Sequence, residues 1–271
     1  MNYDIILEKS IEVAKEAGRT AMKFYGKEQH VKMKAKASPV TDADLASNKI
    51  ILDGLKEFGF EYLSEEDQKD KKRFGAPYVW VIDPLDGTKD FIQMTGEFTI
   101  MFALTKKFKG NVYRPVLGII YQPQKKNLYY AIKDCGAYVL EKLKKKRKLS
   151  VSKRTRPSSL HMLSSRNHGT ELEKEVAFVY GVKHKKELGS SLKACLIADK
   201  VGDVSFNPST HTYEWDVCAS DLIIHEAGGK FTTTKGELFS YNKKDPRNYD
   251  GYLASNGLVH KDFLKVIKKM S

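Results

Sequence analysis

The sequence predicts an α/β (α+β) fold for this chain of 271 residues. Its first half contains β-branched and aromatic runs separated by turn residues, and its second half alternates strand-like with helix-like segments. The hydrophobic fraction of 41% is sufficient for a continuous core. A change of composition near residue 150 predicts two halves, an N-terminal α+β half over 1–150 and a C-terminal α/β half over 151–271.

Two helices are predicted to open the first half. Residues 4–25 place apolar side chains at helical spacing, and Gly26 ends this helix. The run Thr41-Asp42-Ala43-Asp44 is typical of a helix N-terminus. The second helix therefore extends from this run to Gly59.

A buried strand is predicted over 78–82, where Asp83 ends the strand because Pro84 cannot donate to a ladder. The polar stretch over 67–75 before it predicts an exposed loop. Further strands of the first half are predicted over 61–64, 98–105, 115–121, 127–132 and 136–140. The second half is predicted to contain a strand near 160–164, a helix over 169–180, a strand near 185–188, a helix over 190–201, a strand over 203–206, a helix over 216–227 and a strand over 229–233.

The chain is strongly basic, with a formal net charge of +13. Such a charge attracts anions, which include nucleic acids and small polyphosphorylated substrates. The densest basic run, Lys142 to Lys148, precedes the strand-like Leu149-Ser150-Val151. Aromatic residues do not alternate with this run, as a platform for single-stranded nucleic acid requires. We interpret it as an exposed hairpin turn.

Cysteine usage and hydropathy predict the compartment. Cys135, Cys195 and Cys218 lie far apart without a CxxC spacing, which predicts reduced, buried thiols. No apolar run approaches the roughly 20 residues that span a bilayer. Asp4 lies where a secretory leader would be apolar. The sequence therefore predicts a cytoplasmic protein with no membrane partner.

The most informative segment is Asp83-Pro84-Leu85-Asp86-Gly87-Thr88, at the end of a predicted buried strand. Both carboxylates and the Leu85 carbonyl are expected to face the space beyond that strand. Oxygen ligands of this kind suit Mg²⁺ or Mn²⁺. The amides of Gly87 and Thr88 are expected to open a helix and to bind a phosphate.

This string resembles the metal-binding signature of the inositol monophosphatase superfamily. Ser64-Glu65-Glu66 resembles the upstream acidic motif, Val40 to Asp44 the early Thr/Asp motif, and Glu214-Trp215-Asp216 the second signature. The motifs occur in the family's order over roughly residues 5–260. The resemblance implies a layered αβαβα sandwich and a Mg²⁺-dependent phosphatase.

Within the superfamily, further strings are more similar to 3′(2′),5′-bisphosphate nucleotidases than to inositol phosphatases. These strings are Lys89-Asp90-Phe91, Gly96-Glu97-Phe98-Thr99, Ser165-Arg166-Asn167-His168 and Gly189-Ser190-Ser191-Leu192-Lys193. A second phosphate needs donors of its own, and the resemblance assigns this role to Ser165, His168, Ser190 and Lys193. Asn207 departs from the pattern, because the relatives often carry an Arg there.

The resemblance also implies the metal ligands. One Mg²⁺ is expected between Glu65, Asp83 and the Leu85 carbonyl. A second is expected between Asp83, Asp86 and Asp216, about 4 Å from the first. The family's pattern allows a third, weaker ion near Glu65, and Mn²⁺ is an alternative ion.

The implied catalytic residues are Asp44, Glu65 and Thr88. The Thr88 hydroxyl, held by Asp44, and the Glu65 carboxylate orient the attacking water. The amides of Gly87 and Thr88 bind the phosphoryl oxygens. Glu66 either binds an ion through water or holds Lys89.

The leading hypothesis is a phosphatase that converts adenosine 3′,5′-bisphosphate to AMP. Alternatives with the same chemistry are an inositol monophosphatase and a fructose-1,6-bisphosphatase. An alternative of another class is a nucleic-acid-binding protein with an inactive phosphatase core, against which the complete carboxylate set argues. The expected partner is a small phosphorylated substrate and not a nucleic acid. The chain is expected to act as a monomer or homodimer, and the resemblance implies lithium sensitivity and a role in sulfur metabolism.

Overall fold

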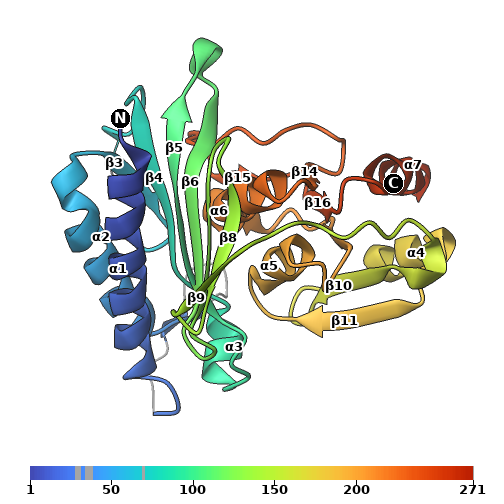
Figure 1. Cartoon of the computed structure of the whole chain (residues 1–271), viewed down its shortest axis with the longest axis horizontal. Coiled ribbons are helices and arrows are strands. Elements are labelled where there is room, and N and C mark those ends of the chain that lie inside the picture. Colours follow the sequence, from blue (N-terminus) through green and yellow to red (C-terminus); the bar gives the residue numbers. More distant parts are fainter. Residues whose placement is uncertain (28–31, 34–38, 69–70, 271) are drawn as a thin grey trace.

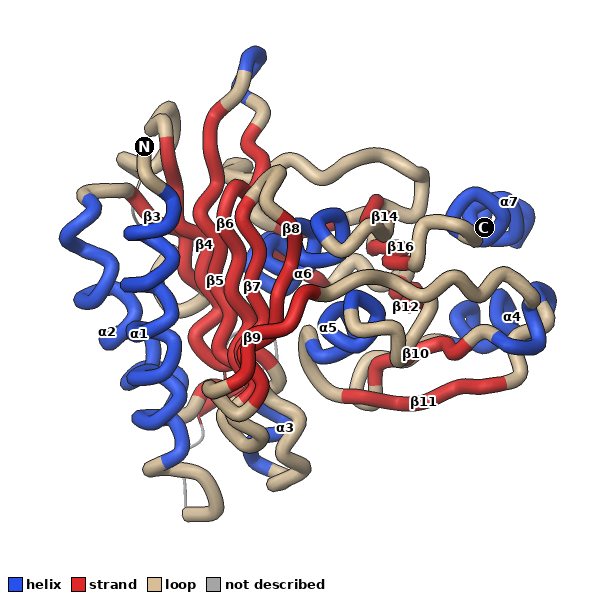
Figure 2. The backbone as a smooth tube through the Cα atoms, viewed as in Figure 1, coloured by secondary structure: helices blue, strands red, loops and turns tan. Residues whose placement is uncertain are grey.

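The computed structural model of the chain describes residues 1–27, 32–33, 39–68 and 71–270. Helices and sheets alternate in five layers (Figures 1 and 2). One helix pair covers a large sheet, a second pair lies between the two sheets, and a third covers the outer face of a small sheet. This arrangement confirms the αβαβα sandwich. The three pairs are α1 (Tyr3–Met22) with α2 (Asp42–Leu55), α5 (Leu192–Ala198) with α6 (Glu214–Glu226), and α4 (Glu171–Tyr180) with α7 (His260–Met270).

The large sheet has the strand order β3-β4-β5-β6-β7-β8-β9 and is antiparallel except for the parallel pair β3 and β4. A short helix, α3 (Thr88–Ile92), follows β4. The strands are β3 (Glu61–Ser64), β4 (Tyr78–Asp86), β5 (Thr99–Lys107), β6 (Tyr113–Gln122), β7 (Asn127–Ile132), β8 (Gly136–Glu141) and β9 (Lys145–Lys148).

The small sheet has the order β11-β10-β12-β16-β14, with β10 parallel to both of its neighbours. Two short strand pairs, β1 with β2 and β13 with β15, lie outside both sheets. The strands are β10 (His161–Ser165), β11 (His184–Leu188), β12 (Val204–Asn207), β14 (Lys230–Thr232), β16 (Tyr252–Ser255), β1 (Lys32–Met33), β2 (Pro39–Val40), β13 (Thr212–Tyr213) and β15 (Arg247–Asn248).

Helix α6 is buried on almost every side because it lies between the two sheets. Alternate residues of β4 face opposite cores: Val81 packs with α6, whereas Trp80 packs with α1 and α2. A Cβ at Gly118 of β6 would approach the Ala219 backbone to 3.3 Å, so glycine lets α6 lie directly on the sheet. The packing places the first turn of α6, with Asp216, beside the end of β4.

Several expectations from the sequence are wrong. The basic run is a turn only in part: residues 142–144 form the expected hairpin turn, but residues 145–148 are the edge strand β9, whose lysines face solvent and discourage a further strand. Residues 149–151 are not a strand. The stretch 67–75 is not exposed throughout, because the buried Arg73 donates from Nη1 to Asn242 Oδ1 at 2.5 Å. Cys135 is exposed, since it lies in the turn between β7 and β8.

Two further observations concern the halves and the membrane. The large sheet ends with β9 and the small sheet begins with β10, on either side of residue 150, although α6 from the second half packs on the large sheet. No helix in the described part of the chain is long and apolar enough to cross a membrane.

Candidate active site

The end of β4 brings two aspartates to one face. The strand does not stop at Asp83 as expected: it continues to Asp86, with a bulge between them, because Asp83 lies opposite Met101 and Asp86 opposite Thr99. Residues three apart on a regular strand face opposite sides, and one extra residue reverses this. The Pro84 carbonyl accepts a hydrogen bond from Ser47 Oγ at 2.7 Å. The bulge therefore turns both carboxylates into the same cavity.

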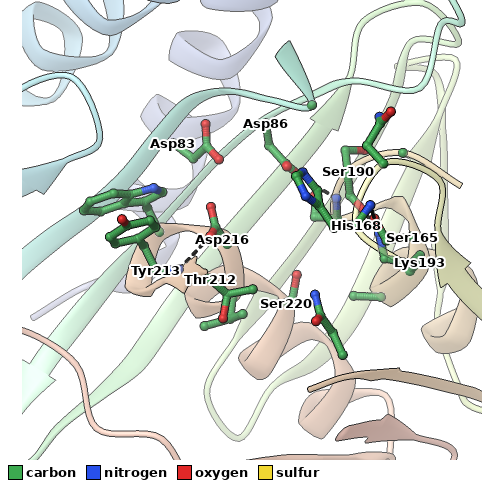
Figure 3. A pocket seen from close by; sticks show the side chains of 18 of the residues that line it. Asp83, Asp86, Ser165, His168, Ser190, Lys193, Thr212, Tyr213, Asp216 and Ser220 are labelled. Carbon is green, nitrogen blue, oxygen red and sulfur yellow. Dashed lines mark hydrogen bonds between the residues drawn. The ribbon is translucent and has the colours of Figure 1, made fainter. Parts of the chain in front are cut away.

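Four carboxylates share this space. Asp83 is buried, and its pKa is raised well above its ordinary value, first by burial and then by the charges of Glu65, Asp86 and Asp216. Figure 3 shows Asp83, Asp86 and Asp216 around one opening. Crowded like charges of this kind favour a bound proton or cation, and an all-oxygen set suits Mg²⁺.

Among the described residues, no three His, Cys, Asp or Glu side chains form a ready-made cage for an ion. The oxygen donors that line the cavity fit a hard divalent ion.

Asp44 connects helix α2 to the cavity wall. Its Oδ2 accepts hydrogen bonds from the Thr41 amide at 2.8 Å and the Thr41 hydroxyl at 2.5 Å, as in a capping box. Its Oδ1 accepts a hydrogen bond from the Thr88 hydroxyl at 3.1 Å, and the Leu85 carbonyl lies 3.3 Å from the same hydroxyl. The buried cap thus fixes the carboxylate that orients Thr88.

Gly87 allows the second half of the chain to approach the first. It caps α3 with a φ of +92°, in the left-handed region. A Cβ here would lie 3.1 Å from the Glu97 carbonyl oxygen and 3.2 Å from Ser190 Cβ. Any larger residue would therefore push Ser190 away from the first turn of α3.

A cavity of about 840 Å³ contains the site. Of the residues that the sequence assigns to the site, Asp44 and Glu66 do not line it, and Asp44 lies behind Thr88. The assigned residues that line it are Glu65, Asp83, Leu85, Asp86, Gly87, Thr88, Ser165, His168, Ser190, Lys193 and Asp216.

The part of the cavity next to Asp86 is lined by Ser165, His168, Ser190 and Lys193, and we call it the basic end. Lys193 is buried and not on a solvated helix face, and its Nζ donates to the Ser190 carbonyl at 2.7 Å. Burial lowers the pKa of Lys193, although Asp86 and other acids nearby act in the opposite direction. His168 lies beside it, on the same side of the cavity as Ser165 and Ser190 (Figure 3). Partial burial and the charges of nearby lysines lower the pKa of His168.

Sequence reasoning missed several lining residues. His211 lies close enough to His168 to lower its pKa, and Tyr213 stacks on Trp215 with ring centroids 4.8 Å apart. Both lie within five residues before Asp216, and this closeness to the second signature is the signal that could have identified them. Asn207, the residue without the expected Arg, is buried, and its Oδ1 accepts from the Ser209 amide at 2.8 Å.

Glu173 of α4 is buried behind the basic end, and its Oε1 has no hydrogen-bond partner among the described residues. Burial raises its pKa from 4.5 to about 7, partly offset by a hydrogen bond from Ser164 and the charge of Lys193, while Glu187 adds to the rise. Between these two values the folded chain holds a proton that the unfolded chain releases. Stability therefore falls as the pH rises through this window.

We expect Glu173→Gln to raise the free energy of unfolding above pH 7 by up to about 3 kcal/mol, and to change it little below about pH 5. The amide is uncharged at every pH and keeps an acceptor for Ser164. Urea denaturation across this pH range measures the difference. The exposed Glu175 on the same helix supplies the control, because Glu175→Gln should give the wild-type profile. A gain that does not depend on pH would contradict this account.

Comparisons with known proteins identify the family of this chain. The chain matches the model of the inositol monophosphatase family over residues 2–270. A 3′(2′),5′-bisphosphate nucleotidase CysQ from Buchnera aphidicola is 34% identical over 88% of this chain and 88% of that protein. The protein of the same name from Escherichia coli K12 is 32% identical over 92% of this chain and 99% of its own length.

A solved structure shows the same fold. The crystal structure of CysQ from Bacteroides thetaiotaomicron is 32% identical and superposes with a TM-score of 0.77, covering 92% of this chain and 96% of that one. The family model covers residues 2–270, the range in which every motif named above lies, and the relatives cover about nine tenths of the chain. The chain therefore belongs to the inositol monophosphatase family of phosphatases, and within it is similar to the 3′(2′),5′-bisphosphate nucleotidases.

Proposed function

We propose that this phosphatase is a Mg²⁺-dependent 3′(2′),5′-bisphosphate nucleotidase, which removes the 3′-phosphate of adenosine 3′,5′-bisphosphate and yields AMP. The observation that carries the proposal is one cavity that holds an acidic end, formed by Asp83, Asp86 and Asp216, and beside it the basic end with Lys193 and His168. The acidic end suits a phosphoryl group held through cations, and the basic end suits a second phosphate bound directly. The names of the curated relatives support the same substrate class.

The carboxylates and one carbonyl would hold the ions. Glu65, Asp83 and the Leu85 carbonyl would bind one Mg²⁺, and Asp83, Asp86 and Asp216 another. A third ion near Glu65 is part of the proposal, and Mn²⁺ shares the preference for oxygen. The ions supply a water of lowered pKa and stabilise the negative charge of the leaving oxygen.

The side chains around the ions would position the reactants. Asp44 accepts a hydrogen bond from the Thr88 hydroxyl. The hydroxyl oxygen is then left to accept a hydrogen bond from the attacking water. Glu65 takes up the proton of that water. The amides of Gly87 and Thr88 hold the phosphoryl oxygens as charge redistributes during direct attack on phosphorus. Ser165 and Ser190 donate to the second phosphate beside Lys193.

Two other functions remain as outcomes of the test. An inositol monophosphatase or fructose-1,6-bisphosphatase would use the same acidic end, and a nucleic-acid-binding protein would use only the charge of +13. We further propose a cytoplasmic enzyme that acts as a monomer or homodimer.

A phosphate-release assay in Mg²⁺ with four substrates distinguishes these functions. The substrates are adenosine 3′,5′-bisphosphate, adenosine 3′-monophosphate, inositol 1-phosphate and fructose 1,6-bisphosphate. We expect the highest kcat/KM with adenosine 3′,5′-bisphosphate. A higher value with inositol 1-phosphate or fructose 1,6-bisphosphate would replace the proposal, and no release from any substrate would favour the non-enzymatic function.

Lithium should inhibit phosphate release. Li⁺ carries one charge and prefers oxygen, so that it replaces a Mg²⁺ among these carboxylates without supplying the same charge stabilisation. We expect inhibition at about millimolar Li⁺ that adenosine 3′,5′-bisphosphate does not relieve. Potassium at equal ionic strength is the control, and full activity at high millimolar Li⁺ would contradict the expectation.

A further inference from the structure

A group of charged side chains joins the two halves of the chain beside the basic end of the cavity. Arg166, which follows β10, donates from Nη1 to Asp90 Oδ1 and from Nη2 to Glu97 Oε2, the second bond at 2.7 Å. Asn167 Nδ2 donates to Asp90 Oδ2 at 2.7 Å. Asp90 belongs to α3 and Glu97 to the segment before β5. We call these four residues the Arg166 clasp.

The clasp also holds the loop 189–191. The Gly189 amide donates to the same Glu97 Oε2 at 2.8 Å. A Cβ at Gly189 would lie 2.6 Å from Asp90 Cγ, so only glycine allows the loop to lie this close. The Ser191 amide then donates to Asp86 Oδ2. The loop is thus attached to the first half at both of its ends.

His168 and Lys193, the two residues that make this end basic, depend on these contacts. Arg166 itself donates its amide to the Leu188 carbonyl at 3.1 Å, immediately before the loop. His168 follows two residues after Arg166, and its amide donates to Ser165 Oγ at 3.2 Å. Ser190 has a strained φ of +53°, and Lys193 is tied to its carbonyl. His168 and Lys193 are therefore both positioned through the clasp.

The guanidinium of Arg166 is not placed to bind a phosphate. Its two terminal nitrogens donate to two carboxylates, one of which, Asp90, is buried. Among the described residues, Ser165, Asn167 and His168 line the cavity, whereas Arg166 does not. Asp90, Glu97 and Arg166 come from three of the motifs that resemble those of bisphosphate nucleotidases, and these motifs contact one another in the clasp.

We propose that the Arg166 clasp determines specificity: it sets the distance between the basic end and the acidic end of the cavity, and so favours substrates with two phosphates. Arg166 and Glu97 are positioning residues in this proposal, and they act through the loop 189–191 and the turn 165–168. The inference rests on the proposed function, because it needs a substrate whose second phosphate reaches the basic end.

The test uses Arg166→Met and Glu97→Gln in the full chain. The measured quantity is the ratio of kcat/KM for adenosine 3′,5′-bisphosphate to that for adenosine 3′-monophosphate, which lacks only the second phosphate. We expect Arg166→Met to lower this ratio about tenfold, mainly through KM for the bisphosphate. Glu97→Gln keeps an acceptor for the Gly189 amide but loses the charge, so we expect a smaller fall in the same direction.

Arg147 offers a matched control. It also joins two acids across the halves, Glu141 at 2.8 Å and Asp199 at 2.6 Å, but it does not belong to the residues that line the cavity. Arg147→Met should lose a comparable ion pair and leave the substrate ratio unchanged. Thermal denaturation of all variants separates loss of folded protein from loss of specificity.

The outcomes are distinguishable. If the wild type itself shows no preference for the bisphosphate, the proposed function is wrong. If the wild type prefers it and Arg166→Met keeps the same ratio, or loses both substrates equally, the clasp does not determine specificity. If Arg166→Met lowers the ratio and Glu97→Gln leaves it unchanged, Arg166 binds the phosphate directly, which also overturns the proposal.

Discussion

Asp83→Asn is expected to lower kcat/KM in Mg²⁺ by at least about a thousandfold while the chain remains folded. Asp83 is the carboxylate that both proposed ions share, and it is buried among Glu65, Asp86 and Asp216. The amide is a poor ligand for Mg²⁺, so both ions lose a charged partner. Phosphate release at saturating Mg²⁺ measures the effect.

The same variant should be more stable than the wild type when no divalent ion is present. The neutral amide removes repulsion from the other three carboxylates, and its oxygen still accepts from the Leu85 amide, as Asp83 Oδ1 does at 3.1 Å. Thermal denaturation with and without Mg²⁺ should show a higher Tm for the variant in chelator. It should also show a smaller shift when Mg²⁺ is added.

Asp221 is a suitable control because it is also a buried aspartate, but it hydrogen-bonds Tyr241 at 2.7 Å and His225 at 2.7 Å and does not line the cavity. Asp221→Asn should lower stability and leave the kcat of the folded fraction unchanged. Full activity of Asp83→Asn in Mg²⁺ would contradict the shared-ligand model.

Lys193→Met is expected to raise KM for adenosine 3′,5′-bisphosphate about tenfold to a hundredfold. The ammonium faces the basic end of the cavity, and we assign it to the phosphate that is not cleaved. A contact made equally in the ground and transition states changes KM more than kcat. The methionine side chain occupies similar space, so the buried position stays filled. Initial rates over a range of substrate concentrations separate the two constants.

Adenosine 3′-monophosphate is the matched substrate for this variant, because it has no second phosphate to lose a contact. The charge of Lys193 also acts on Asp86, so a general loss of metal binding would slow both substrates. Equal effects on the two substrates would therefore show that Lys193 does not bind the second phosphate.

Asn207→Arg adds a cation to the cavity lining, and we expect it to lower KM for the bisphosphate only.

Much of the fold could be predicted from local patterns. The strands β3 to β8 of the large sheet and the helices α1, α2, α4 and α6 follow from apolar periodicity and turn residues, which act over a few neighbouring positions. The elements near the C-terminus, β16 and α7, were not predicted. The apolar positions of helix α7 recur on one face between lysines, which is a strongly amphipathic pattern that could have predicted this helix.

The sequence by itself determined the chemistry of the acidic end. The string from Asp83 to Thr88 brings oxygen donors together within six residues, and local geometry is enough to place them near one another. Glu65 and Asp216 followed from the order of the family motifs. The bulge between Asp83 and Asp86 was not foreseen, because its formation depends on pairing with β5, a partner outside the string.

Only the tertiary structure decided the basic end. The burial of Lys193 and the pairing of Arg166 with two carboxylates depend on residues that are distant along the chain. Arg166 is 76 positions from Asp90 and 69 from Glu97, and Ser191 is 105 positions from Asp86. The composition of the chain and the spacing of its motifs are the same whether Lys193 is buried or solvated, and whichever partner Arg166 binds. The close approach of loop 189–191 to α3, which glycines at 87 and 189 permit, brings these charges together and gives each its partner. Long-range packing is the physical reason, because the burial and charge environment of a side chain are set by neighbours in space.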